Sequence, residues 1–455
     1  MKNKLMISLV AAPLLLSTIA SAEVDLKTSG QAVLYYETHQ DDGVNDQSLF
    51  NQDDSLANVG VQLNVGGDLG NNFTFGSQLS YLGTAGLNRN LVGDTNVHQV
   101  GGSVPLTQTA GASATTNDLA LTKIFVAKQI GNTTAKIGRQ ELPKSLSPFA
   151  YSEGWHVFKN TFEAVLLVNT DIPDTTLVGA AVGGGTSMVG AGLSEMSDGV
   201  AVTDAGKLGL NGAAYMLTAQ NKSIPMTTLT LSYYSLVGVG EKNDITGLGV
   251  GAGDGMHADA VWLDAQIADK ALPLGLNFGL QGGSIMPDDK YTITGVGTVD
   301  VADTVAIGAK AGMKFFDALD LTLAYTSVDG DDNKVNVAIK NTGTGIKSPL
   351  YTQMIYNQDA IALDADTFML KAAYNTGDYG TVIAQYAGTS AGMSNLQGSE
   401  KDYAELDVMY KLKAGGVQYF AAYINRSIDQ GGSLILTQAG AEKDDRVRLW
   451  ARVNF

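Results

Sequence analysis

The sequence of 455 residues predicts an all-β fold, a transmembrane antiparallel β-barrel of about 18 strands, with 16 strands also compatible. Amphipathic or apolar runs of roughly ten residues, the length of a membrane-crossing strand, recur from one end of the chain to the other. No segment shows a convincing helical stripe. The connections between the runs alternate strictly between short and long, as in a barrel whose turns and loops lie at opposite ends.

The predicted strands show the two-residue alternation of a sheet with two unlike faces. In one run Val305, Ile307 and Ala309 alternate with Gly308 and Lys310. We expect the apolar sets to face lipid and the polar sets to face the lumen. The runs lie near residues 24–39, 54–69, 72–84, 118–130, 133–141, 159–170, 175–190, 210–221, 226–240, 257–268, 272–285, 303–315, 318–329, 365–375, 379–389, 401–413, 416–427 and 443–455.

Every second connection is short and carries turn residues such as Gly, Asn, Asp and Pro. The short connections are 70–72, 131–132, 171–174, 222–225, 269–270, 316–317, 376–378 and 414–416. The long ones lie near 40–53, 85–117, 142–158, 191–209, 241–256, 286–302, 330–364, 390–400 and 428–442. In a barrel inserted from the periplasm, we expect short periplasmic turns and long extracellular loops.

Both ends of the chain favour export. Lys2 and Lys4 precede an apolar run, and Ala20-Ser21-Ala22 supplies small residues for cleavage, so we expect a signal peptide at 1–22. Residues 23–455 would then form a single barrel domain. Residues 446–455 of the last strand are apolar on one face and cationic on the other. An amphipathic strand that ends on an aromatic residue such as Phe455 resembles those of Gram-negative outer-membrane proteins.

Composition excludes several classes of protein. No run of 18 or more apolar residues follows residue 22, which argues against a helical membrane protein. The chain has no Cys, so disulfides cannot stabilise it, and a closed hydrogen-bond ladder must do so. A formal net charge of −17 makes nucleic-acid binding a poor prediction.

Charged residues fall on the predicted lumenal faces and on one loop. On the basic side we expect pore-lining residues from three strands, namely Lys310, Lys314, Lys371, Arg446, Arg448 and Arg452. On the acidic side we expect four residues. Glu141 lies at the start of the 142–158 loop and Glu153 within it, while Glu163 and Asp264 lie on strands. The alternative for each residue is a lumenal charge paired with a neighbour only to hold the barrel wall.

Two local motifs resemble a known family. Lys136-Ile137-Gly138-Arg139-Gln140-Glu141 is followed by a long loop and then by Asn160-Thr161-Phe162-Glu163-Ala164. This pattern resembles the third-loop region of OprD-like porins and of the related Campylobacter-type major outer-membrane porins. The resemblance implies an 18-stranded barrel in which residues 142–158 fold inward as the constriction and the C-terminal arginines line one wall. It implies no particular substrate.

Motifs for catalysis or metal binding are largely missing. His39, His98, His156 and His257 have no metal-ligand spacing, and nothing orients His156 toward a nearby serine, so we expect no enzyme, no catalytic residue and no metal site. Calcium remains an alternative to a solvated acidic loop at two places. These are the stretch Asp329-Gly330-Asp331-Asp332-Asn333 and the group Asp41, Asp42, Asp46, Asp53 and Asp54.

The function expected from these features is passive diffusion of small hydrophilic solutes and ions through a water-filled channel in the outer membrane. The 142–158 loop carries Phe149, Tyr151 and Trp155, which is too aromatic for a loop that lies in water, so we expect it to fold into the barrel. We expect its Glu153 to face the arginine column across the channel, with 330–364 as the alternative constriction loop. Expected partners are outer-membrane lipid and lipopolysaccharide. The expected assembly is a homotrimer. The alternative is a barrel that only anchors a surface or adhesin protein.

Overall fold

The computed structural model describes residues 25–42, 48–52, 54–83, 85–87, 118–154, 157–186, 194–195, 214–239, 256–269, 271–293, 297–331, 334–342, 347–391, 401–428 and 442–455. The expected signal peptide therefore lies outside the described residues, as do His98, His156, Asp46, Asp53, Asp332 and Asn333.

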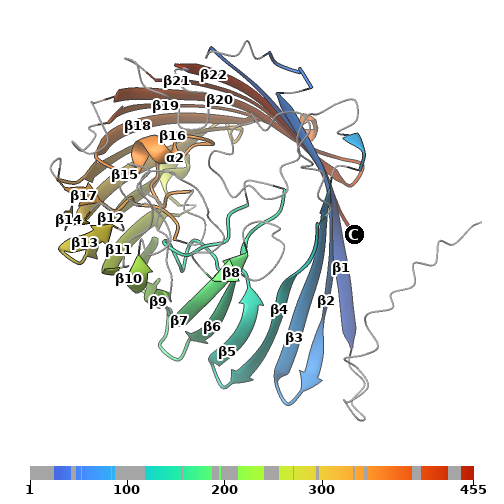
Figure 1. The fold of residues 1–455 in the computed structure, drawn as a ribbon. Coiled ribbons are helices and arrows are strands. Elements are labelled where there is room, and N and C mark those ends of the chain that lie inside the picture. The colour runs from blue at the N-terminus through green and yellow to red at the C-terminus, as the bar shows by residue number, and fades with distance from the viewer. Residues whose placement is uncertain are drawn as a thin grey trace, which may run out of the picture.

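A closed antiparallel barrel of 18 strands forms the molecule (Figure 1). Each strand pairs with the next along the chain, and the first pairs with the last from Gln31–Asn454 to Asp41–Asp444. The strands are β1 (Leu26–Asp41), β2 (Ser55–Gly70), β3 (Phe73–Gly83), β4 (Asp118–Ile130), β5 (Thr133–Gln140), β6 (Thr161–Asn169), β7 (Thr175–Thr186), β9 (Ala214–Asn221), β10 (Thr227–Val239), β11 (Met256–Ala268), β12 (Asn277–Pro287), β15 (Thr304–Phe315), β16 (Leu319–Asp329), β18 (Ala365–Asn375), β19 (Thr381–Ala391), β20 (Lys401–Ala414), β21 (Val417–Ile428) and β22 (Lys443–Asn454).

Short elements occur in some connections. β8 (Ser194–Glu195) pairs with β7, while β13 (Lys290–Ile293), β14 (Gly297–Ala302) and β17 (Val335–Asn336) form a separate small sheet. Single helical turns are η2 (Pro273–Gly275), α2 (Gln358–Ile361) and η3 (Gly377–Tyr379). No helix among the described residues is long and apolar enough to cross a membrane.

The predicted strands are confirmed, each overlapping one strand of the barrel. Two predictions were wrong in detail. The run near 272–285 begins as a strand only at Asn277, because Pro273 lacks the N–H that a strand ladder needs and instead opens η2. The segment 286–302, predicted as a loop, contains the hairpin of β13 and β14.

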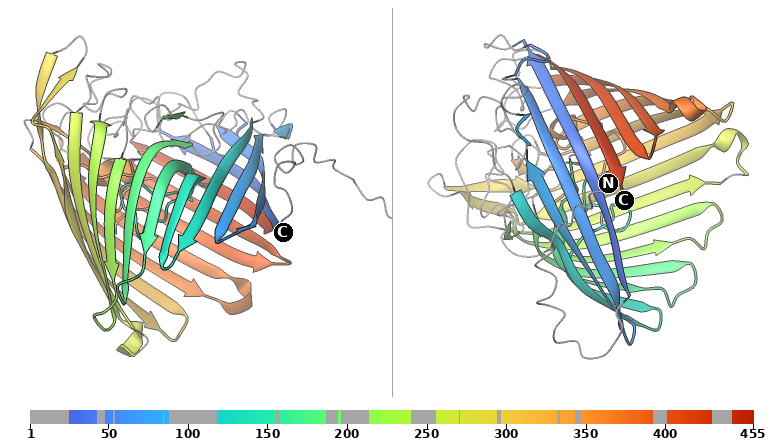
Figure 2. Two further views of the ribbon diagram at one scale, coloured as in Figure 1. Left: turned by 90° about the horizontal axis from the view of Figure 1, so that it is seen from below. Right: turned by 90° about the vertical axis from the view of Figure 1, so that its right-hand side faces the viewer.

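The alternation of connection lengths is also confirmed. Figure 2 shows the tight turns of the strand pairs gathered at one end of the barrel. Two of these turns place consecutive residues at positive φ, Asn71 and Asn72 at 53° and 63° and Phe316 and Asp317 at 50° and 54°. Positive φ at both central residues is the geometry of a two-residue hairpin turn whose twist matches that of the strands.

The wall has an apolar outer face and a largely covered inner face. On β16, Leu323 and Tyr325 are 47% and 45% exposed, whereas Ala324 and Thr326 between and beside them are 3% and 0% exposed. The largest apolar cluster lies inside the barrel, against the inner face of the wall from β6 to β16. Strands alone cannot fill an interior of this width, so the covering residues come from inward-folded loops.

Candidate functional site

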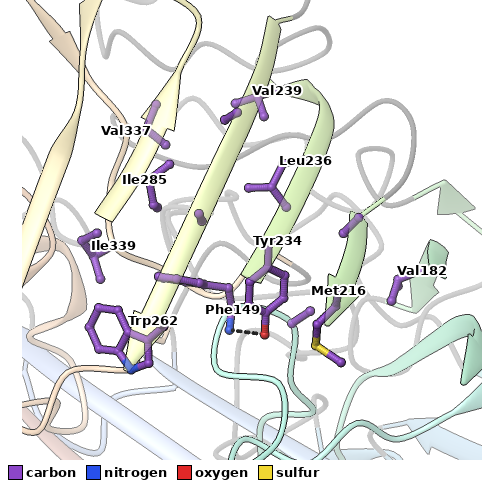
Figure 3. Close-up of a cluster of buried hydrophobic side chains, with 14 of the residues drawn as sticks. Phe149, Val182, Met216, Tyr234, Leu236, Val239, Trp262, Ile285, Val337 and Ile339 are labelled. Atoms are coloured by element: carbon purple, nitrogen blue, oxygen red, sulfur yellow. Dashed lines mark hydrogen bonds between the residues drawn. The ribbon is translucent and has the colours of Figure 1, made fainter. Parts of the chain in front are cut away.

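The loop between β5 and β6 folds into the barrel, as expected for residues 142–158. Phe149 is 0% exposed and packs edge-on against Tyr234 of β10 and Trp262 of β11, with ring centroids 5.5 Å and 5.3 Å away (Figure 3). The backbone N–H of Phe149 also donates to the Tyr234 hydroxyl at 3.2 Å. The aromatic content that predicted an inward loop therefore serves to dock it on the wall.

The same loop reaches the other side of the barrel. Val157 and Phe158 pack in a cluster with Val33, Tyr35, Leu56 and Leu82 of β1, β2 and β3. Gly60 makes room for this contact, since a Cβ atom there would lie 2.6 Å from Cζ of Phe158. The loop thus lies across the lumen from the β1–β3 wall to the β10–β11 wall.

The Gly-Arg-Gln motif closes the wall at the point where β5 departs inward. β5 stops pairing with β4 at Arg139, while β4 continues beyond it. The Arg139 guanidinium bridges the gap, because it donates to the Leu121 carbonyl at 2.5 Å and to Glu163 of β6 at 3.0 Å. Thr161 adds a hydrogen bond to the Thr122 carbonyl at 2.7 Å. Both sequence motifs therefore have a wall-building role.

This geometry corrects the prediction that Glu163 is a pore acid. Phe162 and Ala164 on either side of it belong to the lumenal core, so strand alternation turns Glu163 outward with the exposed Val165. Its carboxylate pairs with Arg139 on that face. The sequence-based face assignment failed here because it treated charge as evidence of a lumenal position.

A second segment, within 334–364, also folds inward, which the sequence offered only as an alternative constriction. Tyr351 donates a hydrogen bond to Asp264 of β11 at 2.7 Å, whereas Tyr356 donates one to Glu37 of β1. Ile339, Ser348 and Ile361 in this segment are all 0% exposed. The loop lacks the periodicity that reveals strands, so only its length and its apolar residues could have signalled this fold.

The two inward segments are bonded to each other. The Thr342 N–H donates to the Phe149 carbonyl at 2.7 Å, and the Tyr151 N–H donates to the Asn341 side chain at 3.0 Å. Lys144 donates to the Ser348 carbonyl at 3.0 Å. We call the described residues of 142–158 and 335–361 together the inner septum.

Glu153 lies within the inner septum. Its Oε1 accepts from the Asn341 side chain at 2.7 Å and from the backbone N–H of Lys347 at 3.1 Å. The expectation that Glu153 faces the arginine column across an open channel was therefore wrong, because its carboxylate binds Asn341 and Lys347 of the second inward segment. Burial lowers the pKa values of Lys144 and Lys347 to about 8, partly offset by the negative charge of Glu153.

Two of the C-terminal arginines have acidic partners, one far away in the chain and one on the same strand. Arg448 Nε donates to Glu37 at 2.7 Å, and Arg446 Nε donates to Asp444 at 2.7 Å. Arg446 and Arg448 are only 5% and 3% exposed. Arg452 differs, since its guanidinium lies 5.0 Å from the Trp450 ring and donates to the Val157 carbonyl at 3.0 Å.

The remaining predicted residues lie at separate places and have different partners. Lys310 lies 4.3 Å from the Tyr351 ring centroid, near Asp264, while Lys314 lies 3.6 Å from Asp320. Lys371 is half-buried on the inner face of β18. Glu141 forms ion pairs with Lys123 and, at 3.1 Å, with Lys159. The structure therefore does not gather the predicted basic and acidic residues into two facing walls.

Histidines and carboxylates give no metal centre in the described part of the chain, where no group of three or more potential ligands could hold a metal ion. His39 Nδ1 lies 3.2 Å from the Asp54 carbonyl, and His257 Nε2 lies 2.8 Å from the Ser235 hydroxyl. Calcium binding stays a prediction, since several of the acidic residues named for it lie outside the described ranges.

A closed barrel with an apolar outer face, a charged inner face and loops folded into its lumen has the architecture of a transmembrane pore protein. No protein-family model matches the sequence, and no curated protein matches it either.

Solved structures resemble the fold over nearly its whole length. OccK8 (OprE) of Pseudomonas aeruginosa matches with a TM-score of 0.66 and 13% identity, covering 95% of this chain and 98% of that one. OccAB3 of Acinetobacter baumannii matches with a TM-score of 0.65 and 13% identity, covering 95% and 100%. OccK2 (OpdF) of Pseudomonas aeruginosa, solved with glucuronate, matches with a TM-score of 0.63 and 14% identity, covering 95% and 98%. The chain therefore has the fold of these barrels.

Proposed function

We propose that the protein is an outer-membrane porin that lets small hydrophilic solutes and ions diffuse passively through its lumen. The observation that carries this proposal is the inner septum, which narrows a closed barrel from inside while apolar side chains cover the outside. A barrel of this strand number has an interior wide enough for an aqueous channel. Diffusion needs no catalytic group, and the charges of the lumen act only by position and field.

Selection of solutes follows from where charge lies relative to the septum. Lys310, Lys314 and Lys371 line the half of the lumen near the tight turns. Asp264 is bonded to Tyr351 of the septum, which holds a negative charge beside the narrow region. A solute that passes the septum then meets a cationic wall, which attracts anionic groups and orients dipolar solutes. Glucuronate, with which OccK2 was crystallised, is an anionic sugar of the size that such a wall would suit.

The membrane environment of the proposed porin follows from its outer face. Exposed Leu323, Phe368 and Leu406 lie on β16, β18 and β20 and would contact lipid chains, with lipopolysaccharide around the long-loop end. Assembly into a homotrimer, calcium binding and a closer relation to the Campylobacter-type porins stay predictions from the sequence. The absence of enzymatic activity also belongs to this proposal.

Planar-bilayer recording tests the proposed function. Purified, assembled protein in potassium chloride should give discrete, stepwise conductance increases, and the same preparation heated in detergent to unfold it should give none. The protein should also fractionate with outer membranes. Recovery as a soluble periplasmic protein would exclude the proposal, and an assembled barrel in outer membranes that never conducts would favour the surface-anchor alternative.

A further inference from the structure

We propose that Tyr356 is the latch, the residue that fixes the inner septum to the barrel wall. The arginines of β21 and β22 bind this tyrosine and do not contact the solute. The inference rests on the proposed channel function. It deepens that function because it names the residue that decides which lumenal charges a passing solute meets.

The aromatic ring of Tyr356 lies among three guanidinium groups. Its centroid is 4.8 Å from Arg426, 4.7 Å from Arg446 and 5.3 Å from Arg448. Such distances are within the range of cation–π attraction, which strengthens when the partners are removed from water. Tyr356 is only 6% exposed, so its ring separates these cations from the open lumen.

The hydroxyl group of Tyr356 joins both signs of charge. It accepts a hydrogen bond from Nη2 of Arg448 at 2.7 Å and donates one to Glu37. Glu37 is the same carboxylate that receives Arg448 Nε at 2.7 Å. The phenol therefore completes a closed set of charge-assisted hydrogen bonds, and removing it would leave buried charged groups short of a partner.

The backbone beside Tyr356 is held by charged side chains as well. The Tyr356 N–H donates to Glu405 of β20 at 2.8 Å, and Nζ of Lys347 donates to the carbonyls of Met354 and Ile355 at 2.9 Å and 2.6 Å. A loop has no ladder partners for these backbone groups, so side chains satisfy them. The Glu405 bond attaches this peptide to the wall, while the Lys347 bonds hold its conformation within the septum.

Pairing explains why the cluster is not a solute site. The guanidiniums of Arg446 and Arg448 are already paired with Asp444 and Glu37, and both arginines are nearly inaccessible. Arg452 lies further along β22, is half-buried, and is not among the cations around Tyr356. Release of the latch would uncover Arg446 and Arg448 and at the same time free the septum to move.

The test is single-channel recording of Tyr356→Ala and Tyr356→Phe with potassium chloride as the probe, in symmetric solution and across a salt gradient. In Tyr356→Ala we expect conductance to rise about twofold and the reversal potential to shift toward anion selectivity, because two or more arginines become accessible. Tyr356→Phe keeps the ring over the guanidiniums but loses the hydroxyl, so it should add flicker with a smaller shift. Tyr379→Ala, in the exposed turn η3, is the matched control and should behave as wild type.

A residue that merely packs in the core would change stability but not the reversal potential. Assembled Tyr356→Ala with wild-type conductance and reversal potential therefore overturns the latch. If that variant does not assemble, Tyr356→Phe decides, and wild-type flicker in it overturns the latch as well. A wild-type protein that gives no conductance steps contradicts the proposed function itself, whereas a conducting wild type with unaltered variants contradicts only the latch.

Discussion

Arg139 shows how a charged side chain can help to build the wall of a barrel. It is 7% exposed and joins β4 to β6 where β5 has turned inward. The neighbouring Gly138 has φ of 120°, and a Cβ atom there would lie only 2.3 Å from the Ile124 carbonyl oxygen. No side chain can occupy that space without moving β4, so this glycine is required by the close approach of two strands.

Substitution of Gly138 by Ala should therefore prevent correct closure of the wall. The matched control is Gly131→Ala in the β4–β5 turn, where φ is also positive at 59° but no atom lies within 4 Å of an added Cβ. The control should lose only about 1 kcal/mol, the usual cost of a left-handed residue with a side chain. Heat-modifiable migration in detergent gels measures the folded fraction. Equal folded fractions for the two variants would contradict the account of Gly138.

Among the elements, strands were predictable from the sequence and inward loops were only partly so. A period of two, repeated with turn residues at each second connection, located every barrel strand. The first inward loop was predicted from Phe149, Tyr151 and their flanking motifs. The pairing of Arg446 with Glu37 was not, because partners separated by about 400 residues in sequence leave no local signal. The charge of Glu163 also led to its assignment to the lumenal face, whereas the buried Phe162 and Ala164 on either side place it on the outer face.

The outer face of β16 allows a direct test of which way the strands face. Leu323 points outward and is 47% exposed, while Lys314 on β15 points into the lumen. An arginine facing the middle of the membrane costs roughly 2 to 4 kcal/mol, so Leu323→Arg should strongly reduce the assembled fraction. Lys314→Leu should assemble as wild type. Folding titrations in urea with lipid vesicles provide the measurement, and the reverse order of stability would mean that the faces are inverted.

The septum should respond to pH through Lys347. Burial lowers the pKa of this lysine to about 8 in the closed septum, where it faces Glu153, Glu405, Asp407 and Arg448, whereas in a released, hydrated segment the pKa would return toward its ordinary value. The released form then binds more protons, so raising the pH above about 8 favours the closed septum, by at most about tenfold per pH unit. Channel flicker should therefore fall as the pH is raised from 7.5 to 10, by at most about tenfold per pH unit above pH 8. Lys347→Met should weaken this dependence and leave only the part due to Lys144, whose pKa burial also lowers to about 8. Flicker that rises with pH in wild type would contradict the assignment.

The whole molecule combines a rigid wall with a packed interior on one side of its lumen. The core cluster covers the wall from β6 to β16, and the Tyr356 cluster attaches the septum to β1, β20, β21 and β22. The path for solutes is therefore narrowed by both inward segments together. The barrel and one of the two segments were predictable from the sequence. Which charges remain available to a solute depends on contacts that exist only after both segments fold inward.

Single-channel conductance of a variant that lacks Ser147 to Gly154 tests whether the two inward segments narrow the channel. The deletion removes Phe149, which docks the septum on Tyr234 and Trp262, and Glu153, which joins its two segments. If two bonded inward segments narrow a water-filled barrel, the assembled variant must conduct severalfold more than wild type in the same potassium chloride solution, because channel conductance grows with the open cross-section. Conductance equal to that of wild type in an assembled barrel, or the absence of conductance steps in both proteins, would contradict this narrowing of a water-filled barrel.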